Sequence, residues 1–148
     1  MRRALAAAAA VFLLAGCGGS KMQTLYRGAA WGVDVKDGKA EVLHLVGGKW
    51  VVDTSHAVEI TILGPKPNEL APNPPQVAIA MHSKTPLVES ALWVDGYRLF
   101  EKGGGTPTNG TIYGAPNPLP AGTHTAVGYA RTAFGGTAVA WTFTVKKA

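Results

Sequence analysis

Larger hydrophobic residues recur at every second position in several short segments of this chain. The clearest example is residues 139–145, in which Val139, Trp141, Phe143 and Val145 alternate with Ala140, Thr142 and Thr144. A period of two is typical of a strand that buries one of its faces. The segments 31–35, 58–62 and 77–81 show the same alternation. Because no window after residue 25 has helical periodicity, the pattern predicts an all-β fold.

Residue pairs that contain glycine separate these segments and indicate tight turns. Asp37-Gly38, Gly47-Gly48 and Asp95-Gly96 are hairpin signals, because two-residue hairpin turns need residues that accept a positive φ. The same reasoning predicts a final hairpin over residues 123–145, which turns at Gly135-Gly136. Gly103-Gly104-Gly105 lacks a following helix that would support a phosphate site, and we expect it to be a mobile loop.

The domain organisation follows from the same turn signals. We expect a β-meander over residues 25–63 and a sandwich over residues 76–148. Residues 55–63 either supply the first strand of the sandwich or remain part of the meander. Residues 64–75 hold five of the ten prolines and form either a linker or a connection along a sheet edge. Residues 1–16 and 17–24 are interpreted below as a targeting segment and a tether.

The N-terminus combines a short basic region with a short apolar run. Met1-Arg2-Arg3 precedes the eleven residues Ala4 to Leu14, which are too few for a membrane span of about 20 residues and suit a signal peptide. The following Leu14-Ala15-Gly16-Cys17 resembles the lipobox of bacterial lipoproteins at all four positions. The alternative is an ordinary secretory signal that ends at a chance cysteine.

The lipobox resemblance implies cleavage before Cys17, diacylglycerol on its sulfur and acylation of the new amine, with palmitate-like chains. Two chains hold a protein stably on a membrane, whereas one does so only marginally. Residue 18 is glycine and not the aspartate that retains some lipoproteins at the inner membrane. We therefore expect the protein to be anchored to the cell membrane or outer membrane and to face the periplasm or the exterior.

The last sixty residues resemble bacterial immunoglobulin-like domains. The resemblance is carried by three segments in order, Leu92-Trp93-Val94-Asp95-Gly96, then residues 118–125 ending in His124-Thr125, then Ala140-Trp141-Thr142-Phe143-Thr144-Val145. It implies an immunoglobulin-like β-sandwich preceded by the β-meander. Many relatives carry an aspartate and an asparagine around the last turn, sometimes tied to calcium, where this chain has Thr132 and Gly136. This departure from the family pattern argues against a calcium site at this turn.

Composition excludes several classes of function. Without Arg2 and Arg3 the chain has 12 basic and 9 acidic residues, a net charge of +3, and the basic residues are dispersed. Nucleic-acid binding would need them concentrated. Cys17 is the single cysteine, so no internal disulfide can form and a lipidated Cys17 cannot act as a nucleophile. No serine lies in a Gly-x-Ser-x-Gly elbow. We therefore expect neither an enzyme nor a cofactor.

Histidines and exposed aromatic residues are the remaining candidates for a site. His44, His56, His82 and His124 are at least twelve residues apart, which does not indicate a metal site, and His124 is expected to bond nearby backbone. Leu92 and Val94 are expected to face inward, so Trp93 faces outward, near Tyr97. These two are the ligand-surface candidates, unless the meander with Trp31 and Trp50 covers Trp93.

The sequence thus predicts a membrane-anchored, non-catalytic binding or structural module of the cell envelope. Its expected partners are the membrane, through the anchor, and an unidentified envelope protein or polysaccharide. The alternatives are a carbohydrate-binding surface lipoprotein, for which Trp93 and Tyr97 would have to be exposed together, and a periplasmic copper-binding protein, for which two or more histidines would have to converge.

Overall fold

A computed structural model describes residues 22–147 of the chain, all of whose regular structure is β-strand. Four strands form a meander sheet in the order β1 (Met22–Arg27), β2 (Trp31–Lys36), β3 (Lys39–Val46), β4 (Lys49–Val52). A second sheet, here called the open sheet, has the order β10 (Lys102–Thr106), β11 (Asn109–Gly114), β7 (Val77–Ser83), β5 (Val58–Gly64). The central sheet has the order β6 (Leu70–Ala71), β13 (Gly136–Val145), β12 (Gly122–Thr132), β8 (Leu87–Val94), β9 (Tyr97–Arg98).

The open and central sheets pack face to face and form an immunoglobulin-like β-sandwich. Their facing side chains make one core, to which β7 contributes Val77, Ile79 and Met81 and the central sheet contributes Leu92 and Phe143 among others. In the open sheet β7 alternates core and outward positions, as a sandwich layer requires, whereas β8 and β12 of the central sheet are buried at consecutive positions. The predicted all-β, immunoglobulin-like fold with an N-terminal meander is confirmed.

Large side chains of one strand lie beside small ones of the next in this core. Trp141 pairs with Ala126 and Val139 pairs with Gly128 in the β12–β13 ladder, and His124, which pairs with Phe143, is the exception. Gly128 on β12 faces the open sheet, and a Cβ at this position would lie 3.0 Å from the Cδ1 of Ile79. Small residues on β12 therefore leave the volume that the large side chains fill, as the sequence pattern predicted.

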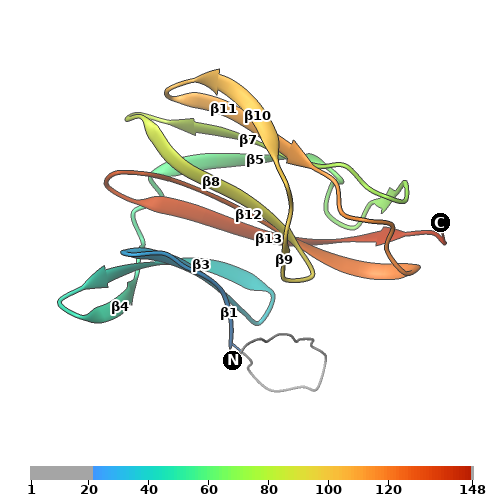
Figure 1. Ribbon diagram of the computed structural model, residues 1–148, viewed down its shortest axis with the longest axis horizontal. Coiled ribbons are helices and arrows are strands. Elements are labelled where there is room, and N and C mark those ends of the chain that lie inside the picture. Colours follow the sequence, from blue (N-terminus) through green and yellow to red (C-terminus); the bar gives the residue numbers. More distant parts are fainter. Residues whose placement is uncertain (1–21, 148) are drawn as a thin grey trace.

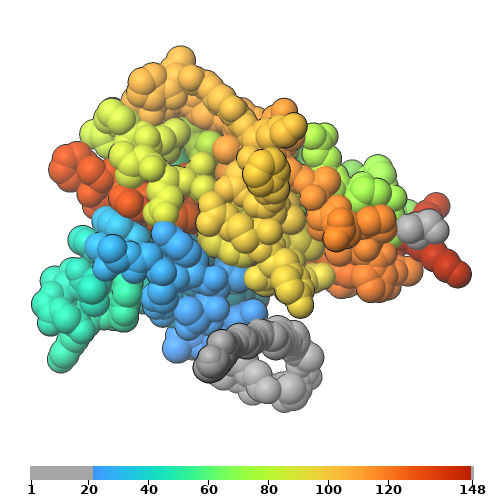
Figure 2. Space-filling model, in the orientation of Figure 1, coloured from blue at the N-terminus to red at the C-terminus, as the bar shows by residue number. Residues whose placement is uncertain are grey.

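The meander sheet covers the second face of the central sheet. Trp31, Val33 and Val42 of the meander form a second hydrophobic cluster with Trp93 and Tyr129 of the central sheet. In Figure 1 the open sheet lies at the top, the central sheet in the middle and the meander sheet at the bottom. Figure 2 shows the blue meander residues directly against the yellow β8–β9 segment. The central sheet is thus buried on both faces.

The three predicted two-residue hairpin turns are present. Asp37 and Gly38 have φ values of 53° and 76°, and Asp95 and Gly96 have 51° and 86°. The glycine pair between β3 and β4 likewise has positive φ at both residues. Two central residues with positive φ twist in the sense of the flanking strands, so the turns join β2 to β3, β3 to β4 and β8 to β9.

One predicted boundary differs from the structure, and one that was left open is decided by it. β1 begins at Met22, within the segment 17–24 that was expected to be a tether, so strand structure starts closer to Cys17. Residues 58–64 form β5, which pairs with β7 in the open sheet, so this segment supplies a strand to the sandwich, the first of the two alternatives. The alternation of Val58, Ile60 and Ile62 gave the strand correctly, but alternation does not tell which strand will be the neighbour.

The Pro-rich residues 64–75 form a connection along a sheet edge, one of the two predicted alternatives, whereas the Gly-rich residues 103–105 do not form the predicted loop. β6 runs parallel to the end of β13, and the Nε1–H of Trp141 donates to the carbonyl of Pro65 at 2.8 Å, so the Pro-rich segment follows the edge of the central sheet. Gly103 and Gly105 belong to β10, where a Cβ would lie only 2.2 and 2.1 Å from carbonyl oxygens of β11. Glycine is required there by the close approach of two strands, so the expectation of a mobile loop was wrong.

Candidate functional site

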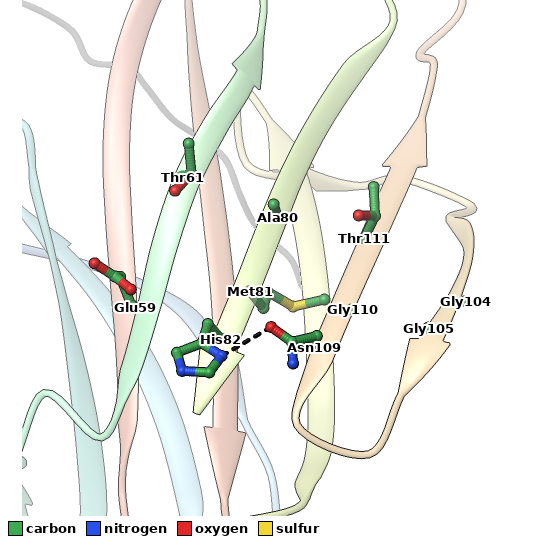
Figure 3. Close-up of a pocket in the computed structure, with 10 residues that line it drawn as sticks. All are labelled: Glu59, Thr61, Ala80, Met81, His82, Gly104, Gly105, Asn109, Gly110 and Thr111. Carbon is green, nitrogen blue, oxygen red and sulfur yellow. Dashed lines mark hydrogen bonds between the residues drawn. The ribbon is translucent and has the colours of Figure 1, made fainter. Parts of the chain in front are cut away.

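A shallow hollow of about 290 Å³ lies on the outer face of the open sheet. Strand alternation turns Glu59 and Thr61 of β5, and Asn109 and Thr111 of β11, away from the core and into solvent. In the register of the sheet His82 of β7 lies between Glu59 and Asn109. Figure 3 shows these polar side chains standing along the strands that border the hollow.

His82 and Asn109 form the one hydrogen bond drawn across the hollow in Figure 3. The distance from Nδ1 of His82 to Oδ1 of Asn109 is 2.8 Å, and because an amide oxygen only accepts, Nδ1–H is the donor. In the tautomer that carries its hydrogen on Nδ1, Nε2 is an acceptor. Glu59, also exposed, adds carboxylate oxygens in the same row, so the row offers both donors and acceptors to a ligand.

Small residues make the floor of the hollow. Ala80 pairs with Thr61 on one side and Thr111 on the other, and Gly104 pairs with Thr111 from β10. A Cβ at Gly104 would meet no atom within 4 Å, so the space above this glycine is open. The second row of the hollow therefore consists of the hydroxyl groups of Thr61 and Thr111, which stand on either side of Ala80.

The two aromatic candidates from the sequence lie in different environments. Trp93 is only 3% exposed, because β1 and β2 cover it, whereas Tyr97 is 76% exposed on β9. Trp93 points away from the core of the sandwich, as expected, but on that side the meander sheet covers it. Trp93 is therefore not a ligand surface, and a sugar-binding pair of Trp93 and Tyr97 is ruled out.

Trp93 instead borders a polar cluster that joins the meander to the central sheet. Glu89 of β8 accepts hydrogen bonds from the hydroxyl of Tyr26 at 2.5 Å and from the hydroxyl of Tyr129 at 2.8 Å. The Nε–H of Arg131 donates to Glu89 at 2.9 Å. The rings of Tyr26, Trp93 and Tyr129 pack around this carboxylate with centroids 6.0 to 6.3 Å apart.

The hydrogen bonds in this cluster shift the pKa values of its members. Burial by itself would raise the pKa of Glu89, but the hydrogen bonds from Tyr26, Tyr129 and Arg131 outweigh it and lower the pKa below 4.5. Burial, then the hydrogen bond to Glu89, raises the pKa of Tyr129. For Tyr26 the hydrogen bond to Glu89 is the larger cause of a raised pKa. Perturbed pKa values can mark an active site, but here the two hydroxyl groups and the Nε–H of Arg131 all bond to the Glu89 carboxylate and tie two sheets together, so we assign the cluster to structure.

His124 has the structural place expected for it. Its Nε2 lies 2.7 Å from the carbonyl oxygen of Pro120 and its Nδ1 lies 2.6 Å from a carboxylate oxygen of Asp95. The other carboxylate oxygen of Asp95 accepts from the backbone N–H of Thr125 at 3.0 Å. The histidine thus ties the β8–β9 turn to the segment that precedes β12. The bond to Pro120 was predicted, and the contribution of Asp95 was not.

The other predicted site residues do not converge. His44 stacks on Trp31 at 3.9 Å between centroids, His82 lies in the hollow, and His124 lies at the β8–β9 turn. Within residues 22–147 no three histidine, cysteine, aspartate or glutamate side chains are close enough together to hold a metal ion. Cys17 lies outside the described residues. In the described part of the chain no helix is long and apolar enough to cross a bilayer.

Sequence reasoning missed the hollow on the open sheet. Glu59 and Thr61 were recognised as the polar positions of one strand, but their neighbours come from residues 80–82 and 104–111, which are distant in the sequence. A second signal was available in Asn109, Thr111 and Tyr113, which alternate with Gly110 and Ile112. Only the register of three strands brings these polar faces together.

No protein-family model matches the sequence, and no curated protein matches it. Among solved structures the chain is similar to CopC from Methylosinus trichosporium OB3b, with 16% identity and a TM-score of 0.40 over 60% of this chain and 95% of that chain. It is also similar to the titin Ig tandem domains A164-A165, with 7% identity and a TM-score of 0.41 over 87% of this chain and 83% of that chain. Similarity at this level carries no conclusion about ligand or activity.

Proposed function

We propose that this chain is a lipid-anchored, non-catalytic binding module of the bacterial cell envelope, held by Cys17 and binding its ligand in the hollow of the open sheet. The observation that carries the proposal is the order of the three sheets. The tether enters the meander sheet at Met22, and the hollow lies on the far side of the sandwich from that sheet. A membrane on the side of the tether leaves the hollow facing away from it.

The chemistry of the hollow favours a saccharide as the ligand. Sugar hydroxyl groups both donate and accept hydrogen bonds, and the hollow presents an imidazole, an amide, a carboxylate and two hydroxyl groups over a small floor. Tyr113, 39% exposed, follows Thr111 on the same face of β11 and adds an aromatic ring beside the polar rows. A protein-binding surface would instead be expected to centre on large apolar or aromatic side chains.

The hollow is tested by blocking it without unfolding the protein. Gly104→Leu places a side chain in open space on the outer face of β10, at a backbone position without a positive φ. We expect this variant to fold normally and to lose binding to soluble peptidoglycan oligosaccharides, measured by isothermal titration calorimetry. Tyr97→Ala, which removes a highly exposed aromatic on β9, is the matched control and should bind like the wild type.

A second variant tests the polar row. His82→Ala removes the ring that bonds Asn109 and exposes no buried group, so it should weaken the same binding by about tenfold, the loss expected for a ligand hydrogen bond of about 1.4 kcal/mol. If Gly104→Leu and His82→Ala bind the oligosaccharides as tightly as the wild type, the hollow is not the site. If the wild type shows no binding, the saccharide assignment fails.

The anchor is tested separately by cell fractionation. The wild-type chain should remain with the envelope membranes, and Cys17→Ala should leave them because it lacks the acceptor for the lipid. Retention of Cys17→Ala on the membranes to the same extent as the wild type contradicts the anchor.

A further inference from the structure

The meander sheet has an outer face that points away from the central sheet. Trp31, Val33 and Val42 face inward, so alternation turns the neighbouring positions of each strand outward. The register carries this face across all four strands, since Met22 pairs with Lys36, Lys36 with Lys39, and Leu45 with Trp50. The outer face therefore includes Met22, Lys36, Lys39, Leu45, Trp50 and Val52. It also includes the acidic residues Asp34, which forms an ion pair with Arg27, and Glu41.

The edge of this sheet at β4 is unusually apolar for an exposed strand. β4 pairs with β3 on one side only, and all four of its residues are exposed. On the outer face Trp50 and Val52 are 36% and 44% exposed. Val51 of β4 and Val46 at the end of β3 point to the opposite side of the sheet and are 49% and 55% exposed. Natural edge strands are normally protected by charge or by a covering segment, and contiguous exposed apolar side chains mark an interaction surface.

Trp50 is held on the outer face by a network that crosses the sheet. The guanidinium of Arg27 on β1 lies 4.9 Å from the centre of the Trp50 ring and 2.7 Å from the carboxylate of Asp34. Gly32 lies beneath this arm, and a Cβ there would be 2.9 Å from Nη1 of Arg27. The packing fixes one side of the indole and leaves the other side exposed, so its position does not depend on a flexible loop.

The point at which the tether joins limits what this face can meet. Four residues, 18–21, lie between Cys17 and Met22, which is 66% exposed on the outer face. The five steps from Cys17 to Met22 span about 17 Å when extended, so a lipidated Cys17 keeps Met22, at one end of this face, within about that distance of the bilayer surface. The two lysines that flank the β2–β3 turn, Lys36 and Lys39, lie on the same face and are exposed.

We propose that the outer face of the meander sheet docks on an anionic lipid bilayer, with Trp50 and Val52 in the interface and Lys36 and Lys39 against the headgroups. This proposal rests on the proposed anchor at Cys17. Tryptophan favours the boundary between headgroups and acyl chains, and lysines near an anionic surface are attracted to it. A second copy of this chain on the same face is one of the outcomes that the test below distinguishes.

The test uses the exposure of Trp50, because the other three tryptophans are at most 7% exposed. The lipidated protein is reconstituted on vesicles of phosphatidylglycerol and phosphatidylcholine with brominated acyl chains, which quench a tryptophan that reaches the interface. We expect quenching in the wild type and its loss in Trp50→Phe. The matched reporter is Trp50→Phe combined with Tyr113→Trp, which moves the fluorophore to the exposed face of the open sheet and should not be quenched.

Charge variants separate docking from simple tethering. Lys36→Glu with Lys39→Glu should reduce quenching at least about threefold, whereas Lys84→Glu with Lys102→Glu, an equal change of charge elsewhere, should leave it unchanged. Quenching of Trp50 no greater than that of the tryptophan at position 113 overturns the docking proposal. A change in Trp50 fluorescence that depends on protein concentration and not on vesicles indicates a second copy and also overturns it.

The anchor and the docking face can fail independently in this experiment. In a parallel preparation the unlipidated chain is joined through the Cys17 thiol to a maleimide-bearing phospholipid on the same vesicles. If the natural protein does not associate with vesicles but the coupled protein shows quenching of Trp50, docking stands and the natural anchor falls. If the natural protein associates and neither preparation shows quenching, the anchor stands and docking falls.

Discussion

Replacing Glu89 with leucine should weaken the contact between the meander sheet and the central sheet. The loss of stability should be larger than for the substitution of an exposed charged residue. The substitution removes the acceptor of three hydrogen bonds, from Tyr26, Tyr129 and Arg131. Tyr129 is 0% exposed, so its hydroxyl would be left buried without this partner, at a cost of about 1–3 kcal/mol. Tyr26 and Arg131 keep access to water and add about 1 kcal/mol between them.

We therefore expect Glu89→Leu to lower the free energy of unfolding by about 2–4 kcal/mol. The measurement is urea denaturation of a Cys17→Ser chain, followed by tryptophan fluorescence, since Trp31 and Trp93 report on the interface between the two sheets. Glu59→Leu, on the exposed face of β5, is the control and should change stability by less than about 0.5 kcal/mol.

A double-mutant cycle with Tyr129→Phe sharpens the result. If Glu89 acts through the buried hydroxyl, the two substitutions together should cost less than the sum of their separate costs by about 1–2 kcal/mol. A Glu89→Leu variant as stable as Glu59→Leu would refute the assignment of this cluster as the joint between the sheets.

Three further predictions concern the fold. The folded state lowers the pKa of Glu89 from 4.5. The ionised carboxylate therefore contributes fully to the free energy of unfolding above pH 4.5, and this contribution is lost as the pH falls through the lowered pKa. We expect stability against urea to depend less on pH in this acid range in Glu89→Gln. Gly128→Val should cost about 1–3 kcal/mol in the same assay, because its side chain meets Ile79. His124→Ala removes the bonds to Asp95 and Pro120 and should cost about 2 kcal/mol, while leaving oligosaccharide binding unchanged.

Much of the fold could be predicted from the sequence because it depends on local patterns. The alternation of residues 139–145 determined which face of β13 is buried, and Asp37-Gly38 and Asp95-Gly96 determined two hairpins through their positive φ values. Strand pairs joined by such turns have their register set by the turn itself. These features need no knowledge of distant parts of the chain.

The features that sequence reasoning missed depend on contacts between distant segments. Gly103 and Gly105 have a composition typical of a loop, and only the carbonyl groups of β11 explain why a strand there must be glycine. The alternation around Trp93 gave its direction, and its cover by the meander was one of the two alternatives left open; only the structure decides between them. Glu89 gave no signal, since its partners Tyr26 and Tyr129 are 63 and 40 residues away.

The central claim is that Cys17 is the point at which the protein is held to a membrane. Mass spectrometry of the protein purified from envelope membranes of its natural host tests this most directly. We expect an N-terminal peptide that begins at Cys17 and carries a diacylglycerol thioether. A peptide with residues 1–16 still attached, or with an unmodified thiol at position 17, would contradict the claim.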